Sequence, residues 1–294
     1  MSNIVINYFR VLEVIGSLNI DFNDSFRVGR KAKMYDIEVF ALSLTAEYMS
    51  IDSENDLFKQ LVNTTIPNLI ERSQFNKRRR KLFEFSELIR TTLASSFLEF
   101  EDYLIIDSML LEICKKSREN RLKICKKDFE TAPSKGFCSS QDTWFYGYNL
   151  RGICSVSGVF HSADITKENV HDVQILNDVK NQLPDCVLLG DRGCLSSAQQ
   201  LDLFQSANII LETPMRRNQK GYIKQAYIFR KSRKRIESLF SQLCDQFKIR
   251  NNYAKSIEGF KARILVQITA LTLVQYINKF IFDRPINNIK IQIN

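Results

Sequence analysis

Residues 103–107 read YLIID and residues 187–191 read VLLGD, so two short apolar runs each lead into an aspartate. Apolar runs of this length are typical of buried strands. Asp107 and Asp191 would then lie at the rim of a hydrophobic sheet, where the functional sites of such folds gather. If the two strands are neighbours, the carboxylates converge and favour a hard cation such as Mg²⁺ or Mn²⁺. The alternative is that each aspartate forms a turn or caps a helix.

Further strands and helices are expected around these two runs. The predicted elements are strands at 144–155, 159–165 and 208–212, and helices at 168–183, 195–206, 230–248 and 257–281. A hairpin followed by alternating helices and strands predicts an α/β fold, a mixed sheet flanked by helices. Residues 112–130 are expected to form a polar, lysine-rich connector.

A third acid lies on the helix predicted at 230–248. One face of this helix is apolar, through Ile236, Phe240, Leu243 and Phe247. Glu237 lies at the margin of that face, one turn after Arg233. One interpretation is a surface ion pair with Arg233, which would contribute only a few tenths of a kcal/mol. The other is that Glu237 completes a carboxylate site for two metal ions that act at phosphorus.

The positive charge of the chain is concentrated in its last third. The 294 residues carry a formal net charge of +9, and residues 201–294 hold 17 of the 42 Lys and Arg but only 6 of the 33 acids. The densest part surrounds Glu237 and includes Arg230, Lys231, Arg233, Lys234 and Arg235. A cluster of one sign is more typical of a phosphate-binding surface than of a solvated helix face, which mixes its signs.

Residues 1–98 are predicted to be helical, because apolar residues recur there at steps of three and four. A helix expected from Ser73 carries the unbroken basic run Lys77, Arg78, Arg79, Arg80 and Lys81. Several short helices followed by a basic one fit a helix-turn-helix DNA reader. A small helical bundle with a charged exterior fits equally well, and the pattern leaves both open.

The composition excludes several classes of protein. With 44% hydrophobic and 26% charged residues the chain is of ordinary globular composition, neither disordered nor fibrous. Seven cysteines without close pairs indicate reduced thiols and argue against a zinc site. The first residues lack a signal-peptide pattern, and the apolar stretch 264–278 is too short for a membrane span. We therefore expect a soluble, cytoplasmic protein.

Two smaller sets of residues are expected to be mainly structural. His161 and His171 are the only histidines; His171 opens a predicted helix, where it would either cap the helix or touch substrate, and a structural role is expected. A row of aromatic residues, Trp144, Phe145, Tyr146 and Tyr148, lies along one predicted strand. Core packing is expected for at least half of them, and the remainder would be free to stack on an exposed base.

Four motifs together resemble one family. They are IIDSM around Asp107, the hairpin WFYGYNLRGICSVSGVF, LLGDRGC around Asp191, and SRKRIESLFSQL around Glu237. The spacing of the three acids, with Asp191 84 positions after Asp107 and Glu237 46 positions after Asp191, is similar to that of the DDE transposases of short bacterial insertion sequences. The segments DIEVFALSLTAEY and SQFNKRRRKL extend the likeness, within that family, to the group named after insertion sequence 982.

This resemblance implies a fold and a domain order. The expected fold is a ribonuclease H-like mixed sheet flanked by helices, preceded by an all-α, helix-turn-helix-like domain. The expected domains are a DNA-recognition domain at 1–98, a catalytic domain at 99–250 and a helical extension at 251–294.

The resemblance also implies an activity. The protein would cleave DNA at the ends of an insertion sequence and join the 3′-hydroxyls to target DNA, with Asp107, Asp191 and Glu237 holding two Mg²⁺ ions, which Mn²⁺ can replace. Arg192 and the basic residues around Glu237 would hold phosphates, and Lys77 to Arg80 would contact the terminal inverted repeats. The partners would be double-stranded DNA and further copies of the chain, in a homodimer or larger assembly at the bacterial nucleoid, with no membrane.

The sequence departs from the family pattern at five positions. Cys194 replaces a usual Tyr, Asn149 and Arg151 replace a Lys and a His of the hairpin, Arg230 replaces a Tyr, and Cys244 replaces a Lys. These departures keep two alternatives open. One is a structure-selective DNA nuclease without strand transfer, and the other is a catalytically inactive DNA-binding protein derived from a transposase.

Overall fold

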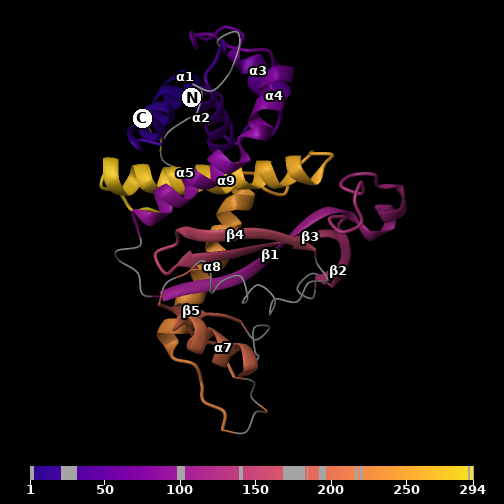
Figure 1. Ribbon diagram of the computed structural model, residues 1–294, viewed down its shortest axis with the longest axis vertical. Helices are drawn as coiled ribbons and strands as arrows, with labels where there is room; N and C mark the ends of the chain where they lie inside the picture. Colours follow the sequence, from indigo (N-terminus) through magenta and orange to yellow (C-terminus); the bar gives the residue numbers. More distant parts are fainter. Residues whose placement is uncertain are drawn as a thin grey trace. The chain divides into compact units, whose positions relative to one another are not determined.

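The computed structural model describes residues 3–20, 32–97, 103–138, 142–167, 183, 185–191, 197–215, 218, 221–290 and 292–293. The chain forms two compact units (Figure 1). Unit 1 comprises Met1–Ser96 together with Gln242–Asn294, and unit 2 comprises Phe97–Ser241. The expected N-terminal domain and C-terminal extension therefore belong to one unit rather than two, and the boundary of the catalytic unit falls inside a helix.

Unit 1 is helical. Its helices are α1 (Ile4–Ser17), α2 (Asp36–Tyr48), α3 (Glu54–Leu61), α4 (Arg72–Lys81), α5 (Phe83–Ser95) and α9 (Ile257–Tyr276), followed by a π-helical turn at Ile277–Ile281. Helix α9 packs against α2 and α5, which explains why the C-terminal segment joins the N-terminal helices. The side chain of Ser256 caps α9 by accepting a hydrogen bond from the Gly259 N–H (3.3 Å).

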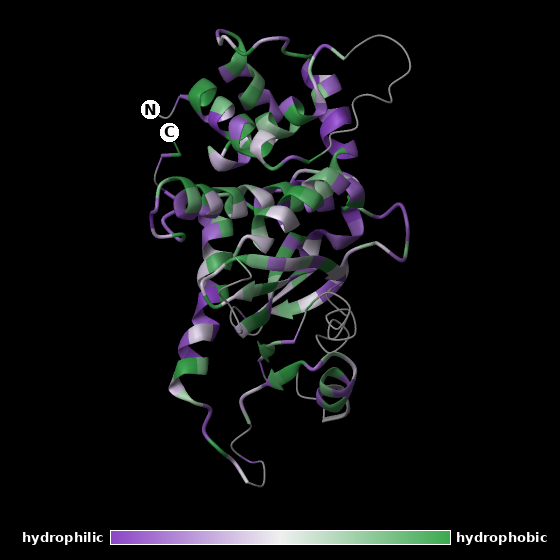
Figure 2. Ribbon diagram, turned by 60° about the vertical axis from the view of Figure 1, so that its left-hand side comes forward, coloured by the Kyte–Doolittle hydropathy of each residue, from purple (hydrophilic) through white to green (hydrophobic). Residues whose placement is uncertain are grey.

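Helix α9 is the core helix that the sequence predicts. It is apolar and long enough to pass as a membrane span, but most of that span, Ile257–Ile281, is buried inside the protein. Even its polar side chains Gln267, Thr269 and Thr272 are fully buried. In Figure 2 its ribbon is coloured mainly from white to green, the hydrophobic end of the scale. A helix that is apolar on all sides is expected at the centre of a helical unit.

The basic segment after Ser73 forms two helices rather than one. Helix α4 ends at Lys81 and α5 begins at Phe83, with Leu82 between them outside helical geometry. Helices α3 and α4 are joined by residues 62–71, which is longer than the three- or four-residue turn of a helix-turn-helix.

Unit 2 contains one mixed sheet. Its elements are β1 (Tyr103–Lys115), a 3₁₀ helix η3 (Lys116–Arg121), β2 (Ser134–Cys138), β3 (Thr143–Ser155), β4 (Phe160–Lys167), β5 (Val187–Leu189), α7 (Ser197–Ala207), β6 (Ile210–Glu212) and α8 (Tyr227–Asp245). The order is β2-β3-β1-β5-β6. Strand β4 also pairs with β3, along the part of β3 that follows the part paired with β2. Strands β2, β3, β4 and β1 are antiparallel neighbours, whereas β1, β5 and β6 run parallel. This order and direction are those of a ribonuclease H-like sheet, as predicted.

The two faces of the sheet are covered by different helices. Leu104 and Ile106 of β1 belong to a buried cluster that includes Leu203 of α7. Because side chains alternate along a strand, Ile105 and Asp107 point to the other face. On that face the ring of Phe160 packs against Phe240 of α8, with centroids 6.0 Å apart.

Some elements differ from the prediction. Strand β1 continues to Lys115, so the predicted polar connector begins within a strand, and β2 was not expected. Both extensions pair with β3, which shows that backbone pairing prevailed over the polar composition. The helix predicted at 168–183, with His171, lies almost entirely outside the described residues.

Candidate active site

Asp107 and Asp191 are brought to neighbouring strands. Strands β1 and β5 are parallel neighbours, with Tyr103 opposite Val187 and Ile105 opposite Leu189. The same register, continued by two residues, sets Asp107 beside Asp191, just beyond the carboxyl end of β5 and within β1, which continues to Lys115. The two strands are therefore neighbours, which is the condition for the carboxylates of Asp107 and Asp191 to converge.

Asp107 is half-buried, and its surroundings disfavour its charge. The pKa of its carboxyl is raised to about 6, mainly by burial and to a smaller extent by the nearby carboxylates of Asp191 and Glu237. A hydrogen bond from the Ser108 N–H (2.8 Å) and the charge of Arg233 act in the opposite direction. The three predicted acids and Arg233 thus lie within electrostatic range of one another.

Glu237 reaches this face from α8. Its apolar neighbours Ile236, Phe240 and Leu243 are buried, as predicted, whereas Glu237 itself is exposed. Arg233, one turn earlier, is half-buried, and these two described side chains form no ion pair with each other. The interpretation of Glu237 as one partner of a surface ion pair therefore has no support in the structure.

The donor set suits a hard divalent cation. Within the part of the chain that the structure describes, no three His, Cys, Asp or Glu side chains already form a cluster that could hold a metal ion. The three acids nevertheless supply only carboxylate oxygens, the ligands that Mg²⁺ and Mn²⁺ prefer. A cation among them would offset the repulsion from Asp191 and Glu237, which adds to the effect of burial on the pKa of Asp107.

The basic residues around Glu237 are mostly at the surface. Arg230, Lys231 and Lys234 are exposed, and Arg235 is half-buried. The guanidinium of Arg230 lies over the ring of Tyr227, 5.8 Å from its centroid. Arg192 lies outside the described residues.

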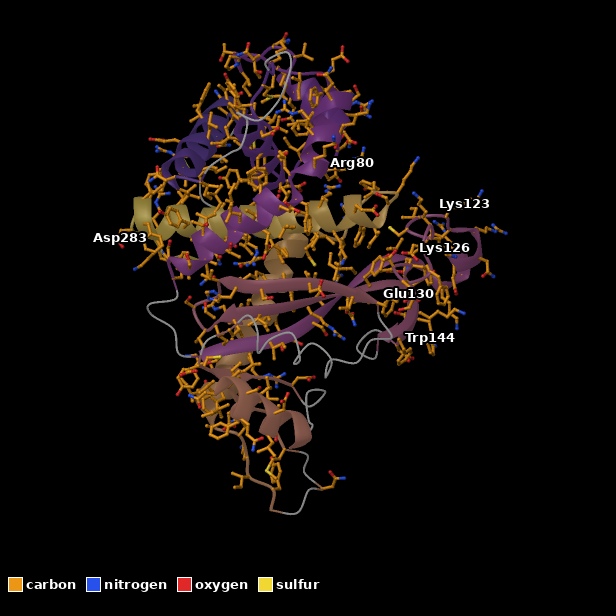
Figure 3. The ribbon with its side chains drawn as sticks, in the orientation of Figure 1. Arg80, Lys123, Lys126, Glu130, Trp144 and Asp283 are labelled. Atoms are coloured by element: carbon orange, nitrogen blue, oxygen red, sulfur yellow. The ribbon has the colours of Figure 1, made fainter. Side chains whose placement is uncertain are left out.

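The basic run on α4 divides into two kinds of residue. Arg78 forms an ion pair with Asp36, and Arg79 lies 3.8 Å from Glu47 and 3.4 Å from Glu54. These two arginines tie α4 to α2 and α3, a role that sequence reasoning missed because the partner acids lie on other helices. Lys77 and Arg80 are exposed on the same helix, and Arg80 is labelled in Figure 3.

Two departures from the family pattern point away from the acids. Gly152 is the residue of β3 directly opposite Asp107, so it lies on the same face of the sheet as Asp107. Asn149 and Arg151 are an odd number of residues away from Gly152 along β3. They therefore lie on the other face of the sheet, where Arg151 is 2% exposed. Burial raises the pKa of Cys244, and Cys194 lies outside the described residues.

The sequence was compared with protein families and with curated protein sequences. The chain matches the family described as Transposase DDE domain over residues 99–273. No curated protein sequence matches it.

Among solved structures, the chain is similar to a Mos1 transposase paired-end complex with left transposon end (13% identity, 90% of this chain and 85% of that chain, TM-score 0.25). It is also similar to the Mos1 strand transfer complex (12% identity, 87% and 81%, TM-score 0.23). At these TM-scores the likeness supports no conclusion about this chain. The family match is different, because it spans more than half of the chain, from just before β1 to near the end of α9. The protein belongs to the transposase DDE domain family.

Proposed function

We propose that this transposase cleaves DNA at the ends of an insertion sequence and joins the freed 3′-hydroxyls to target DNA. The observation that supports the proposal is that Asp191, Glu237 and Arg233 all act electrostatically on Asp107, which lies within β1 beside the carboxyl end of β5. Three acids and one cation form the donor set that phosphoryl transfer requires, without a nucleophilic side chain.

The three acids would hold the divalent cations that this family uses, and Mg²⁺ is proposed, with Mn²⁺ as a substitute. When bound, such ions supply Lewis acidity toward the scissile phosphodiester. Asp107 would bind in its ionised form, which its burial disfavours in the absence of a cation. Glu237, carried by a helix packed on the sheet through Phe240, would approach from the side opposite to α7.

The basic residues of α8 would hold the DNA backbone. Arg233 already lies near Asp107, so its guanidinium is placed to bind a non-bridging phosphate oxygen. Arg230, Lys231 and Lys234 are exposed on the same helix and would bind neighbouring phosphates, with Arg235 and Arg192 as further contacts. These contacts position the duplex and carry no sequence information of their own.

Unit 1 would recognise the terminal inverted repeats. Lys77 and Arg80 present exposed charges on α4, whereas the charges of Arg78 and Arg79 are used to hold the helix in place. The proposed recognition unit therefore includes the C-terminal segment, because α9 is its core. A homodimer or larger assembly at the bacterial nucleoid is proposed, since two element ends must meet for joining.

The test is a supercoiled plasmid that carries the element with its flanking DNA. Incubation of the full-length protein with Mg²⁺ or Mn²⁺ should release the element ends and produce joined products. Nicked or linear plasmid without joined products would favour the structure-selective nuclease instead. Tight, end-specific binding without any metal-dependent cleavage would favour the inactive DNA-binding protein.

A further inference from the structure

A second basic surface, remote from the acids, lies at the Lys115 end of the paired strands β1 and β3. The connection between β1 and β2, residues 116–133, contains Lys116, Arg118, Arg121, Lys123, Lys126 and Lys127. All six are exposed, and we name them the distal basic patch. Figure 3 shows Lys123 and Lys126 beyond the ends of the strands.

Most of these charges are not used by the fold. Among the described residues no carboxylate forms an ion pair with Arg118, Arg121, Lys123 or Lys127. The neighbouring Glu119 is instead paired with Lys135, at 3.4 Å. The connection holds six cations against the three acids Glu119, Asp128 and Glu130, and a surface with such an excess of positive charge attracts a polyanion, because binding releases the condensed counterions of that polyanion.

Aromatic side chains accompany the patch. Trp144, at the start of β3, is 53% exposed, and the Nζ of Lys116 lies 4.5 Å from the centre of its ring. The ring of Phe137 lies beside it, with centroids 5.2 Å apart, and is also exposed. Exposed aromatic faces next to lysines suit the sugars of a DNA backbone, whose phosphates the lysines would bind.

Strand β1 sets the distance between the patch and the acids. Asp107 and Lys115 lie on the same continuous strand, eight residues apart. At ~3.3 Å per residue this separates them by roughly 26 Å, which corresponds to roughly 8 base pairs of B-form DNA at about 3.4 Å per pair. A straight duplex that passes the acids along β1 would reach Lys115, directly before the first residue of the patch, after roughly 8 base pairs.

We propose that the distal basic patch binds the phosphate backbone of duplex DNA about 8 base pairs from the cleavage site. This inference rests on the proposed function, because it takes as its reference point a duplex bound at the three acids. The lysines and arginines neutralise phosphates on one flank, so the duplex is held at two places on unit 2.

The fluorescence of a tryptophan in the chain can be used to detect binding at this site. Trp144 is the only tryptophan, and it lies against Lys116 of the patch. A duplex on the patch draws the Lys116 ammonium toward a phosphate and changes the surroundings of the indole. DNA bound only by unit 1 or α8 leaves the fluorescence of Trp144 unchanged.

The experiment uses the full-length protein, metal-free, and end-containing duplexes that extend from 2 to 14 base pairs on either side of the cleavage site. We expect the fluorescence change and a gain in affinity to appear together once one flank exceeds roughly 8 base pairs. The triple variant Arg121→Gln/Lys123→Gln/Lys127→Gln should lose that gain. Its affinity should fall on the order of 10-fold or more, with a salt slope about 2 to 3 smaller.

A charge-matched control carries Lys59→Gln, Lys279→Gln and Lys290→Gln, three exposed lysines of unit 1. It should keep the length-dependent gain. The inference is overturned if Trp144 fluorescence does not respond to DNA, if the two triple variants lose the same affinity, or if poly-glutamate matches the duplex at equal salt. Cleavage by the wild-type protein is measured in parallel, so failure of the patch is distinguished from failure of the proposed function.

Discussion

Gly152 lies directly opposite Asp107 on the neighbouring antiparallel strand, and it has no room for a side chain. A Cβ at this position would lie 2.7 Å from Cε1 of Phe160, a fully buried ring. Phe160 in turn packs against Phe240 of α8, one turn after Glu237. The absence of one methyl group on β3 therefore lets α8 approach the sheet closely enough to bring Glu237 near Asp107.

Gly152→Ala is expected to reduce cleavage on the order of 10- to 100-fold by displacing α8, since small misplacements of catalytic groups are costly. It should also lower the free energy of unfolding by about 1–3 kcal/mol through overpacking. Adding Phe160→Leu should restore part of the cleavage rate, because the ring atom that clashes is removed. The control is Gly16→Ala on α1, where a Cβ meets no atom within 4 Å. Wild-type cleavage by Gly152→Ala would contradict this account.

Asp191→Asn should abolish metal-dependent cleavage while leaving the affinity for end-containing duplex within a few-fold of wild type. The amide keeps the shape of the side chain but removes the negative charge that a divalent cation requires. Glu212→Gln is the matched control, because Glu212 ends the adjacent strand β6 yet is not among the charges that perturb Asp107. Unchanged strand joining by Asp191→Asn, measured on the plasmid substrate, would remove this residue from the proposed site.

Asp107→Asn should stabilise the metal-free protein at alkaline pH. The pKa of Asp107 is raised to about 6 in the folded state, so the folded state binds the proton more tightly and loses stability as pH rises from about 4 through about 6. The asparagine variant escapes this loss. Its advantage in urea unfolding with a chelator present should be larger at pH 8 than at pH 5, by on the order of 1 kcal/mol.

Saturating Mg²⁺ should reverse that difference, because a cation binds the ionised carboxylate of the wild-type protein and not the amide. An equal stability difference at pH 5 and pH 8 would show that Asp107 is not held in a charge-disfavouring environment.

Arg79→Gln and Lys77→Gln should have different effects, because Arg79 is expected to stabilise the fold and Lys77 to contact DNA. Arg79 is paired with Glu47, which is fully buried and also lies 3.4 Å from Nε of Arg263. Removing one partner of such a buried network typically costs about 3–5 kcal/mol. Lys77 is exposed, so its loss should leave thermal unfolding unchanged and lower the affinity for end-containing duplex. A stable Arg79→Gln protein with weakened DNA binding would reverse these assignments.

The strands and helices around the acids were predictable because their sequence periods are strong. YLII and VLL form β1 and β5, and the apolar stripe of α8 packs as its spacing indicates. Strand β2 was not predictable, because SKGFC has no apolar run and becomes a strand only through its pairing with β3. Among the aromatics, the sequence left open which would be buried, and Phe145, Tyr146 and Tyr148 are, while Trp144 is not.

The sequence by itself determined which residue types are available for chemistry: two aspartates at strand ends, one glutamate beside an apolar helical stripe, and an excess of cations around it. Local periodicity and composition carry that information. Only the tertiary structure decided that β1 and β5 pair in the register that sets Asp107 beside Asp191, and that burial raises the pKa of Asp107. It also decided that Arg78 and Arg79 hold unit 1 together, while among the described residues Lys123 and Lys127 of the β1–β2 connection form no ion pair. Strand register and ion pairing join residues far apart in the chain, so no local pattern encodes them.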